Sequence, residues 1–188
     1  MLARSERDEI ARLWNRKLEQ DRAGVPQTQR HRNLEPPSAE FLAALAAGVG
    51  AKKIIEIGGS TGISTIALAS AARETGGRLI SIEMEAERQA EARGTLARLQ
   101  LDAVVDFVLA DAADVLPCQT ELDLALIDCE KEDYIRFFDM LPMRCGGIVV
   151  ADNILSHSLW DYVKHVRAQA GVESITFAIG KGLEVTRV

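Results

Sequence analysis

Apolar residues recur along the chain in two different patterns of spacing. Within residues 5–20 they return every three or four positions with charged residues between them, which predicts an amphipathic helix. Residues 21–37 hold one glycine and three prolines and are typical of a loop. A second, shorter helix is expected over 38–47, with Ser38 as its N-terminal cap.

From residue 53 onward, short apolar runs alternate with longer polar or amphipathic stretches. The runs predict strands at 53–57, 78–82, 104–109, 122–127, 147–151, 174–179 and 183–188. The stretches between them predict helices over 60–72, 85–99, 111–116, 134–141 and 159–170. This alternation predicts an α/β fold: a mostly parallel seven-stranded sheet with helices on both faces. The last two strands, joined around Gly180-Lys181-Gly182, add an antiparallel C-terminal hairpin.

Composition narrows the function classes. The 188 residues suit a single domain, and a net charge of −6 excludes a generally basic nucleic-acid binder. The charge is uneven, because residues 1–35 carry a net +2 and the remainder a net −8. Three cysteines without a C-x-x-C spacing argue against a disulfide framework or a zinc knuckle. With no apolar run suited to a signal peptide or a membrane span, we expect a cytoplasmic protein.

The first predicted strand runs into a glycine-rich turn, EIGGSTGIS, over residues 56–64. A dinucleotide fingerprint would need glycines where Ser60 and Ile63 stand, and the lysine of a P-loop is missing. What remains is acid-x-Gly-x-x-x-Gly, the form found in adenosylmethionine-dependent methyltransferases. The alternative is a turn that only fits a tight corner between strand and helix.

The second predicted strand ends at an acid, Glu83. A carboxylate at this place can accept both hydroxyls of a ribose. Because no phosphate-binding feature accompanies it, the pattern favours a nucleoside without phosphate. The alternative is a solvated carboxylate near the start of a helix.

Two further strands end in oxygen-bearing side chains, Asp128 after the fourth and Asp152 with Asn153 after the fifth. Carboxylate and amide oxygens suit Mg²⁺ or another hard divalent cation. Lys131 lies three residues past Asp128, and a lysine near a divalent cation can act as a general base. The alternatives are ordinary turn chemistry for Asp-Asn and a surface lysine paired with a neighbouring acid.

Together these segments resemble the metal-dependent class I O-methyltransferase family, which includes the catechol and caffeoyl-coenzyme A O-methyltransferases. The resemblance covers roughly residue 41 to the C-terminus, through EIGGSTGIS, SIEM, ADAADVLP, LIDCEKEDY, GGIVVADNIL and GKGLEV. It implies a Rossmann-like methyltransferase fold in one domain, 1–188. Residues 1–37 would cover the active site as a helix and loop, and 38–188 would form the catalytic core.

The resemblance also implies roles for individual residues. Lys131 would take the acceptor's hydroxyl proton beside Asp128, and the metal ligands would be Asp128, Asp152 and Asn153. S-adenosyl-L-methionine would be bound by Glu56, Gly58, Gly59, Ser60, Gly62, Ser64, Glu83, Met84, Asp111, Ala112 and Asp128. The acceptor would be a catechol-like or phenolic small molecule, and a homodimer is expected by analogy.

Two alternatives remain open from the sequence. The first is methylation of a tRNA hydroxyl, for which the basic residues of segment 1–35 would have to contact phosphate. Their interleaving with acids is more typical of a solvated helix face. The second is a catalytically silent module that only binds the methyl donor, and the intact set of candidate ligands and base argues against it.

Overall fold

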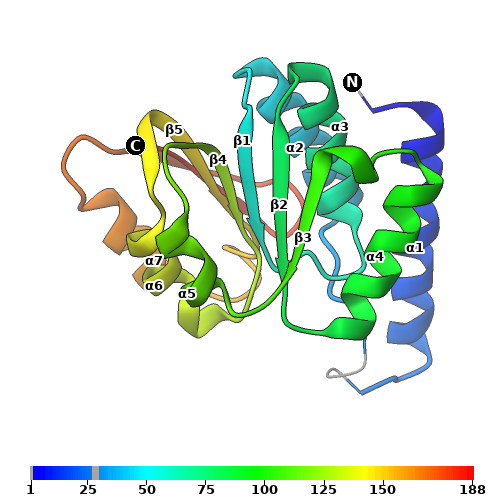
Figure 1. The fold of residues 1–188 in the computed structure, drawn as a ribbon. Helices are drawn as coiled ribbons and strands as arrows, with labels where there is room; N and C mark the ends of the chain where they lie inside the picture. Colours follow the sequence, from blue (N-terminus) through cyan, green and yellow to red (C-terminus); the bar gives the residue numbers. More distant parts are fainter. Residues whose placement is uncertain (1, 27–29) are drawn as a thin grey trace.

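The computed structural model describes residues 2–26 and 30–188, in which helices and strands alternate (Figure 1). The strands are β1 (Lys53–Ile57), β2 (Arg78–Glu83), β3 (Val105–Leu109), β4 (Leu122–Ile127), β5 (Met143–Ala151), β6 (Glu173–Phe177) and β7 (Leu183–Arg187). The helices are α1 (Arg4–Arg22), α2 (Pro36–Gly48), α3 (Ile63–Thr75), α4 (Ala86–Arg98), α5 (Ala112–Val115), α6 (Tyr134–Met140) and α7 (Trp160–Arg167). Short 3₁₀ turns are η2 (Asp102–Val104), η3 (Leu116–Cys118) and η4 (Lys131–Asp133).

The strands pair into one seven-stranded sheet in the order β3-β2-β1-β4-β5-β7-β6. The first five run parallel, and β7 pairs antiparallel with both β5 and β6. The predicted fold class is therefore confirmed, including the antiparallel C-terminal hairpin. The fifth strand begins at Met143, four residues before its predicted start at 147, because a register shift against β4 lets it pair across an irregular stretch.

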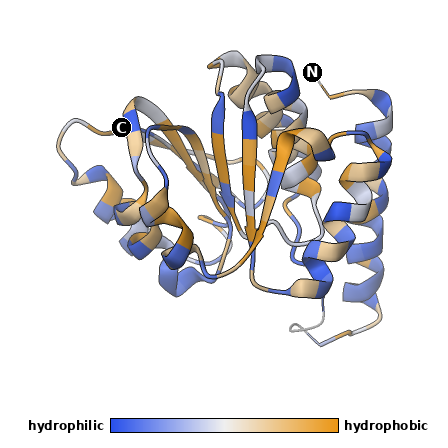
Figure 2. Ribbon diagram, in the orientation of Figure 1, coloured by the Kyte–Doolittle hydropathy of each residue, from blue (hydrophilic) through white to orange (hydrophobic). Residues whose placement is uncertain are grey.

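Each central strand is buried on both faces, so successive residues enter different cores. Ile54 packs against α2 and α3 on one side of the sheet, whereas Ile55 packs against α6 and α7 on the other. Figure 2 shows the matching pattern, with apolar colouring along the strands and hydrophilic colouring on the outer helix surfaces. Because burial on two faces removes the alternation of a surface strand, these strands read as nearly continuous apolar runs.

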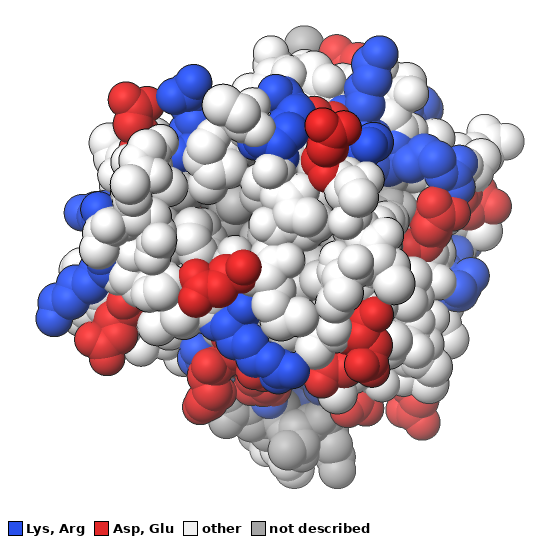
Figure 3. All heavy atoms as spheres, turned by 60° about the vertical axis from the view of Figure 1, so that its left-hand side comes forward, with Lys and Arg blue, Asp and Glu red and all other residues white. Residues whose placement is uncertain are grey.

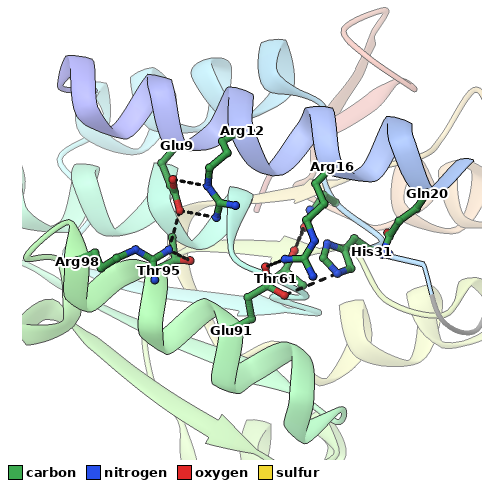
Figure 4. Close-up of polar contacts among 10 residues, drawn as sticks. Glu9, Arg12, Arg16, Gln20, His31, Thr61, Glu91, Thr95 and Arg98 are labelled. Atoms are coloured by element: carbon green, nitrogen blue, oxygen red, sulfur yellow. Dashed lines mark hydrogen bonds and ion pairs between the residues drawn. The ribbon is translucent and has the colours of Figure 1, made fainter. Parts of the chain in front are cut away.

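The N-terminal helix α1 lies alongside α3 and α4 (Figure 1). Figure 4 shows the polar contacts that tie it to α4: Glu9 accepts hydrogen bonds from Arg12 and Arg98, and Arg16 reaches Glu91. On the side facing α3, Glu6 is buried and pairs with Arg73 over 2.8 Å. Most charged side chains between the apolar positions of α1 therefore form hydrogen bonds or ion pairs with other residues of the chain.

The second helix starts earlier than its sequence predicts. It begins at Pro36 with Glu35 at the cap position, since a proline is already set for the first helical turn. Ser38 is buried inside the first turn, and its hydroxyl has no hydrogen-bond partner among the described residues, so its predicted capping role is wrong. None of the described helices is long and apolar enough to cross a membrane.

Candidate active site

A cleft of about 570 Å³ opens at the carboxyl ends of β1, β2 and β4. Its walls come from the loops that follow these strands, from the segment after β5, and from the N-terminal segment before α2. This is the edge at which parallel α/β sheets bind ligands, because the connecting loops diverge there and leave a crevice. Residues far apart in the sequence therefore meet in one place.

The glycine turn after β1 forms the floor of the cleft. Gly58 has a φ of +96°, and a Cβ atom on it would lie 2.1 Å from the carbonyl oxygen of Asp128. Its amide donates to the carbonyl of Ile82 over 2.9 Å. Only glycine allows both this backbone conformation and this close approach of two strand ends. The turn therefore fixes the position of Asp128 relative to β1 and β2.

Glu83 braces the same turn from the end of β2. One of its carboxylate oxygens accepts the amide of Ser60 over 2.7 Å, and the other accepts the amides of Met84 and Glu85 over 2.8 and 3.0 Å. The side chain is buried yet contributes to the wall of the cleft. Three backbone donors hold the carboxylate in one orientation, and about one of its four acceptor sites, on Oε2, is left for a ligand.

Glu56 occupies a different place from the one expected of a ligand contact. It is fully buried beneath the turn, where its carboxylate accepts hydrogen bonds from Thr65 and Ser81, and it is not part of the cleft wall. Burial raises the pKa of Glu56, although these hydroxyl donors oppose the shift. A Cβ on Gly59 would lie 2.9 Å from this carboxylate, so Gly59 is needed for packing.

The predicted methyl-donor residues thus separate into two groups. Gly58, Ser60, Glu83, Met84, Asp111, Ala112 and Asp128 line the cleft. The cleft wall does not include Glu56, Gly59, Gly62 and Ser64, which lie behind the turn, and their contact with the methyl donor stays a prediction. Glu56 enters the core because the end of β1 is buried on both faces.

Two acids and an amide gather at the ends of β4 and β5. The Asn153 amide donates to Oδ1 of Asp128 over 2.7 Å, and Asn153 itself has a φ of +65°. Asp152 lies behind this pair, almost fully buried, and its Oδ1 has no hydrogen-bond partner among the described residues. Burial raises the pKa of Asp128, and burial together with the charge of Asp128 raises the pKa of Asp152 to about 7.

This donor set fits a hard divalent cation. Two buried carboxylates with raised pKa values, one of them with an unpartnered oxygen, are stabilised by a cation that replaces the missing solvent. The described residues contain no group of three or more His, Cys, Asp and Glu side chains placed to hold a metal, so the third ligand would be the amide oxygen of Asn153. Burial raises the pKa of Cys129 to about 12, so its thiol is protonated in the metal-free protein.

Lys131 reaches the same end of the cleft from η4. Its Nζ donates to the hydroxyl of Tyr134 over 2.9 Å and to the carbonyl of Cys129 over 3.1 Å, and it lies 3.9 Å from Oδ1 of Asp128. Tyr134 is fully buried and its hydroxyl donates to the backbone carbonyl of Asp152 over 3.2 Å. The amine is therefore held beside the two acids by a fixed acceptor.

The N-terminal segment supplies lining residues that the sequence indicated only as part of a covering segment or as candidate phosphate contacts. Lys17 and Asp21 of α1 and residues 30–33 contribute to the wall, and Arg32 forms an ion pair with Glu130 on the opposite side. The Asn33 amide is hydrogen bonded to the hydroxyl of Thr61 in the glycine turn over 2.9 Å. Residues 27–29 of the predicted covering loop lie outside the described residues.

Comparison with known proteins agrees with this arrangement. Residues 13–183 match the model of a family described as O-methyltransferase. The chain belongs to this O-methyltransferase family. The resemblance seen in the sequence is therefore confirmed at the level of the family.

Among relatives in this family, a catechol O-methyltransferase of Niastella koreensis is 33% identical over 140 residues, covering 71% of this chain and 61% of that protein. A catechol O-methyltransferase of Mycobacterium tuberculosis is 35% identical over 121 residues, covering 62% of this chain and 54% of that protein. The matched part of the chain thus spans between about half and three fifths of the length of these relatives.

Solved structures of O-methyltransferases share the fold. An enzyme of Bacillus cereus with bound SAH has a TM-score of 0.79 at 21% identity and covers 100% of this chain and 92% of its own. TomG of Streptomyces achromogenes with bound SAM has a TM-score of 0.80 at 21% identity and covers 100% of this chain and 91% of its own. The whole fold, including the antiparallel C-terminal hairpin, is therefore common to these O-methyltransferases.

Proposed function

We propose that this chain is an S-adenosyl-L-methionine-dependent O-methyltransferase that methylates a hydroxyl of a catechol-like or phenolic small molecule with the help of a divalent cation. One observation carries the proposal: the glycine turn, the carboxylate of Glu83 and the pair Asp128–Asn153 line a single cleft. A nucleoside-binding end and a cation-binding end are thus joined within one pocket. The names of the relatives support the same reaction.

At the donor end, each residue has a distinct task. Glu83, held by three backbone amides, accepts the ribose hydroxyls. Met84 is 69% exposed on the cleft wall and covers one face of the adenine. Asp111 and Ala112 line the cleft where the edge of the adenine would lie. Gly58 lines the cleft next to Asp128 and keeps the β4 end close to the glycine turn, where the sulfonium end would lie.

At the acceptor end, Asp128, Asp152 and Asn153 would hold the cation, which when bound makes a phenolic hydroxyl more acidic. Lys131 receives the hydroxyl proton, since its Nζ lines the cleft beside Asp128. Tyr134 positions that amine through its hydroxyl. Holding donor and acceptor in one cleft removes on the order of 7–11 kcal/mol of barrier in well-oriented reactions.

The basic residues near the N-terminus support a small-molecule acceptor over RNA. Most of them form ion pairs within the chain: Arg12 with Glu9, Arg16 with Glu91, Lys17 and Arg30 with Asp21, and Arg32 with Glu130. Figure 3 shows the face that lies to the left in Figure 1, where acidic and basic side chains both occur around a mostly uncharged middle. Binding to a phosphate backbone needs clustered cations instead.

The test is a methyl-transfer assay with radiolabelled S-adenosylmethionine. Separate reactions contain catechol, a hydroxycinnamoyl thioester or tRNA, each with Mg²⁺ or with EDTA. We expect labelled catechol with Mg²⁺, loss of product with EDTA and recovery with excess Mg²⁺. Labelling of tRNA alone would show that the acceptor is RNA and not a phenol. Equal rates with Mg²⁺ and with EDTA would contradict the role of the cation, and no transfer to any acceptor would reject the proposal.

A matched pair of variants tests the cation ligands. Asp152→Ala should reduce turnover at least about 100-fold, because one charged ligand is lost. The same variant should leave the affinity for S-adenosylhomocysteine, measured by calorimetry, within about threefold, since two strands separate β5, which Asp152 follows closely, from β2 and Glu83 at the donor end. Asp102→Ala, at an exposed aspartate in η2, is the control and should leave both quantities unchanged.

A further inference from the structure

Lys181 stands out among the cationic side chains of the cleft. Lys17, Arg30 and Arg32 form ion pairs with acids, and Lys131 is hydrogen bonded to Tyr134. In the part of the chain that the structure describes, no hydrogen bond or ion pair is formed by the ammonium group of Lys181, which lines the same cleft.

The backbone around Lys181 is fixed in place. It lies in the turn between β6 and β7, and its carbonyl accepts the amide of Leu155 over 3.0 Å. On either side stand Gly180 with a φ of +56° and Gly182 with a φ of +91°. A Cβ on Gly182 would lie 2.8 Å from the amide nitrogen of Leu155. Two glycines thus let the turn press against the segment that follows Asn153.

The same turn is held from the other side by α2. A Cβ on Gly180 would lie 2.5 Å from the hydroxyl of Ser38 and 3.1 Å from the carboxylate of Glu35. The half-buried Lys181 side chain therefore starts from a clamped backbone and enters the cleft at its acceptor end. Its positive charge acts on Asp128, Asp152 and His157.

A charge balance of the acceptor end shows what Lys181 lacks. Arg32 is matched by Glu130, and a divalent cation would match the two carboxylates of Asp128 and Asp152. A hydroxyl that gives its proton to Lys131 leaves a negative oxygen beside the resulting ammonium group. Among the lysines and arginines that line this end of the cleft, Lys181 then has no acid within hydrogen-bond or ion-pair distance among the described residues, and an anionic group on the acceptor would supply one.

We propose that Lys181 determines acceptor specificity by pairing with a carboxylate carried on the ring of a catechol. This inference rests on the proposed function and names the substrate class of the same site. The cleft volume of about 570 Å³ has to hold both the methyl donor and the acceptor, which favours a single ring with a short charged substituent.

Kinetics with three acceptors test this role: catechol, protocatechuate, which adds one carboxylate to catechol, and a catechol carrying an aminomethyl group. Lys181→Met should raise KM for protocatechuate about tenfold, the scale of one charge-assisted hydrogen bond, and change KM for catechol by less than about twofold. Lys181→Arg should retain the preference for protocatechuate. Lys181→Glu should shift the preference to the aminomethyl compound.

Lys52→Met is the matched control, because this exposed lysine precedes β1 at the opposite edge of the sheet and should change none of the three KM values. An equal rise in KM for catechol and protocatechuate would overturn the inference and make Lys181 a general support of the acidic site. Calorimetric binding of protocatechuate in the presence of S-adenosylhomocysteine repeats the comparison without turnover. If wild-type protein methylated none of these acceptors, the proposed function would fail, and this binding measurement would still decide the role of Lys181.

Discussion

Arg32 and Glu130 form an ion pair that joins the segment before α2 to the loop after β4 across the cleft. The two residues are 98 positions apart in the chain, and each belongs to a loop that lines the cleft. Nearby, Asn33 anchors the same segment to Thr61 in the glycine turn. The N-terminal segment therefore contacts both the donor end and the acceptor end of the site.

Breaking this ion pair should affect ligand retention more than stability. Both side chains are exposed, at 39% and 65%, so Arg32→Ala should lower the free energy of unfolding by less than about 1 kcal/mol. The off-rate of S-adenosylhomocysteine should rise about threefold or more, because one side of the cleft is released. Stopped-flow displacement and urea unfolding measure the two effects. Arg78→Ala, which breaks the exposed pair with Asp106 outside the cleft, should lower stability similarly without changing the off-rate.

Removing the hydroxyl of Tyr134 should slow turnover by loosening Lys131. Tyr134→Phe deletes the acceptor that holds Nζ at 2.9 Å, and we expect kcat to fall about tenfold with KM nearly unchanged. The free energy of unfolding should fall by about 0.5–1.5 kcal/mol. Tyr162→Phe is the control, because the buried Tyr162 hydroxyl has no hydrogen-bond partner among the described residues. If both variants changed kcat equally, the positioning role of Tyr134 would be wrong.

Gly58 should tolerate no side chain. Gly58→Ala places a Cβ 2.1 Å from the Asp128 carbonyl at a φ of +96°, so the free energy of unfolding should fall by about 2–4 kcal/mol and binding of S-adenosylhomocysteine should be lost. Gly94→Ala is the contrasting variant, since the nearest atom to its Cβ is 3.7 Å away within α4. It should raise the free energy of unfolding by about 0.5–1 kcal/mol. Chemical denaturation of both variants measures the expected decrease and increase in the free energy of unfolding.

His31 should make stability depend on pH in the mildly acidic range. Burial lowers the pKa of His31 from its ordinary value of 6.5, and the positive charges of Arg16 and Arg88 lower it further, whereas the charge of Glu91 opposes the shift. Figure 4 shows His31 between Arg16 and Glu91. The unfolded chain therefore binds the proton more readily than the folded protein. The contribution of neutral His31 to the free energy of unfolding is fully present above pH 6.5. It is lost as the pH falls from 6.5 toward the lower pKa that His31 has in the folded state.

The difference between wild type and His31→Gln isolates this contribution. Urea unfolding at several values between pH 7.5 and pH 5 should show wild type losing about 1 kcal/mol or less relative to the variant, because only one group titrates differently. A difference that stays constant over this range would contradict the expected effect of burial.

The strands were predictable because their apolar runs are short and bounded by turn residues. β1 and β4 begin and end where the sequence places them. The start of β5 was not predictable, since Gly146 and Gly147 interrupt the apolar pattern and the register shift that tolerates them depends on β4. Local patterns specify an element, whereas pairing partners specify its limits.

The candidate site was predictable to the extent that topology creates it. Asp128 and Asn153 meet because parallel strand ends meet, which can be inferred from element order alone. Arg32 gave no such signal, because its loop has no periodic pattern and its position follows from contacts with distant residues. The buried position of Glu56 was missed for a related reason, since only the assembled sheet shows that β1 is covered on both faces.

The contact between Gly58 and the Asp128 carbonyl has a consequence for how this protein can diversify. Under the proposal above, substrate range would change through Lys181, a side chain on the cleft wall. Selection cannot adjust the spacing between the donor and acceptor ends, because a single missing methyl group sets it. New acceptors would therefore arise by exchanging residues on the rim of the cleft, while the distance over which the methyl group travels is inherited unchanged.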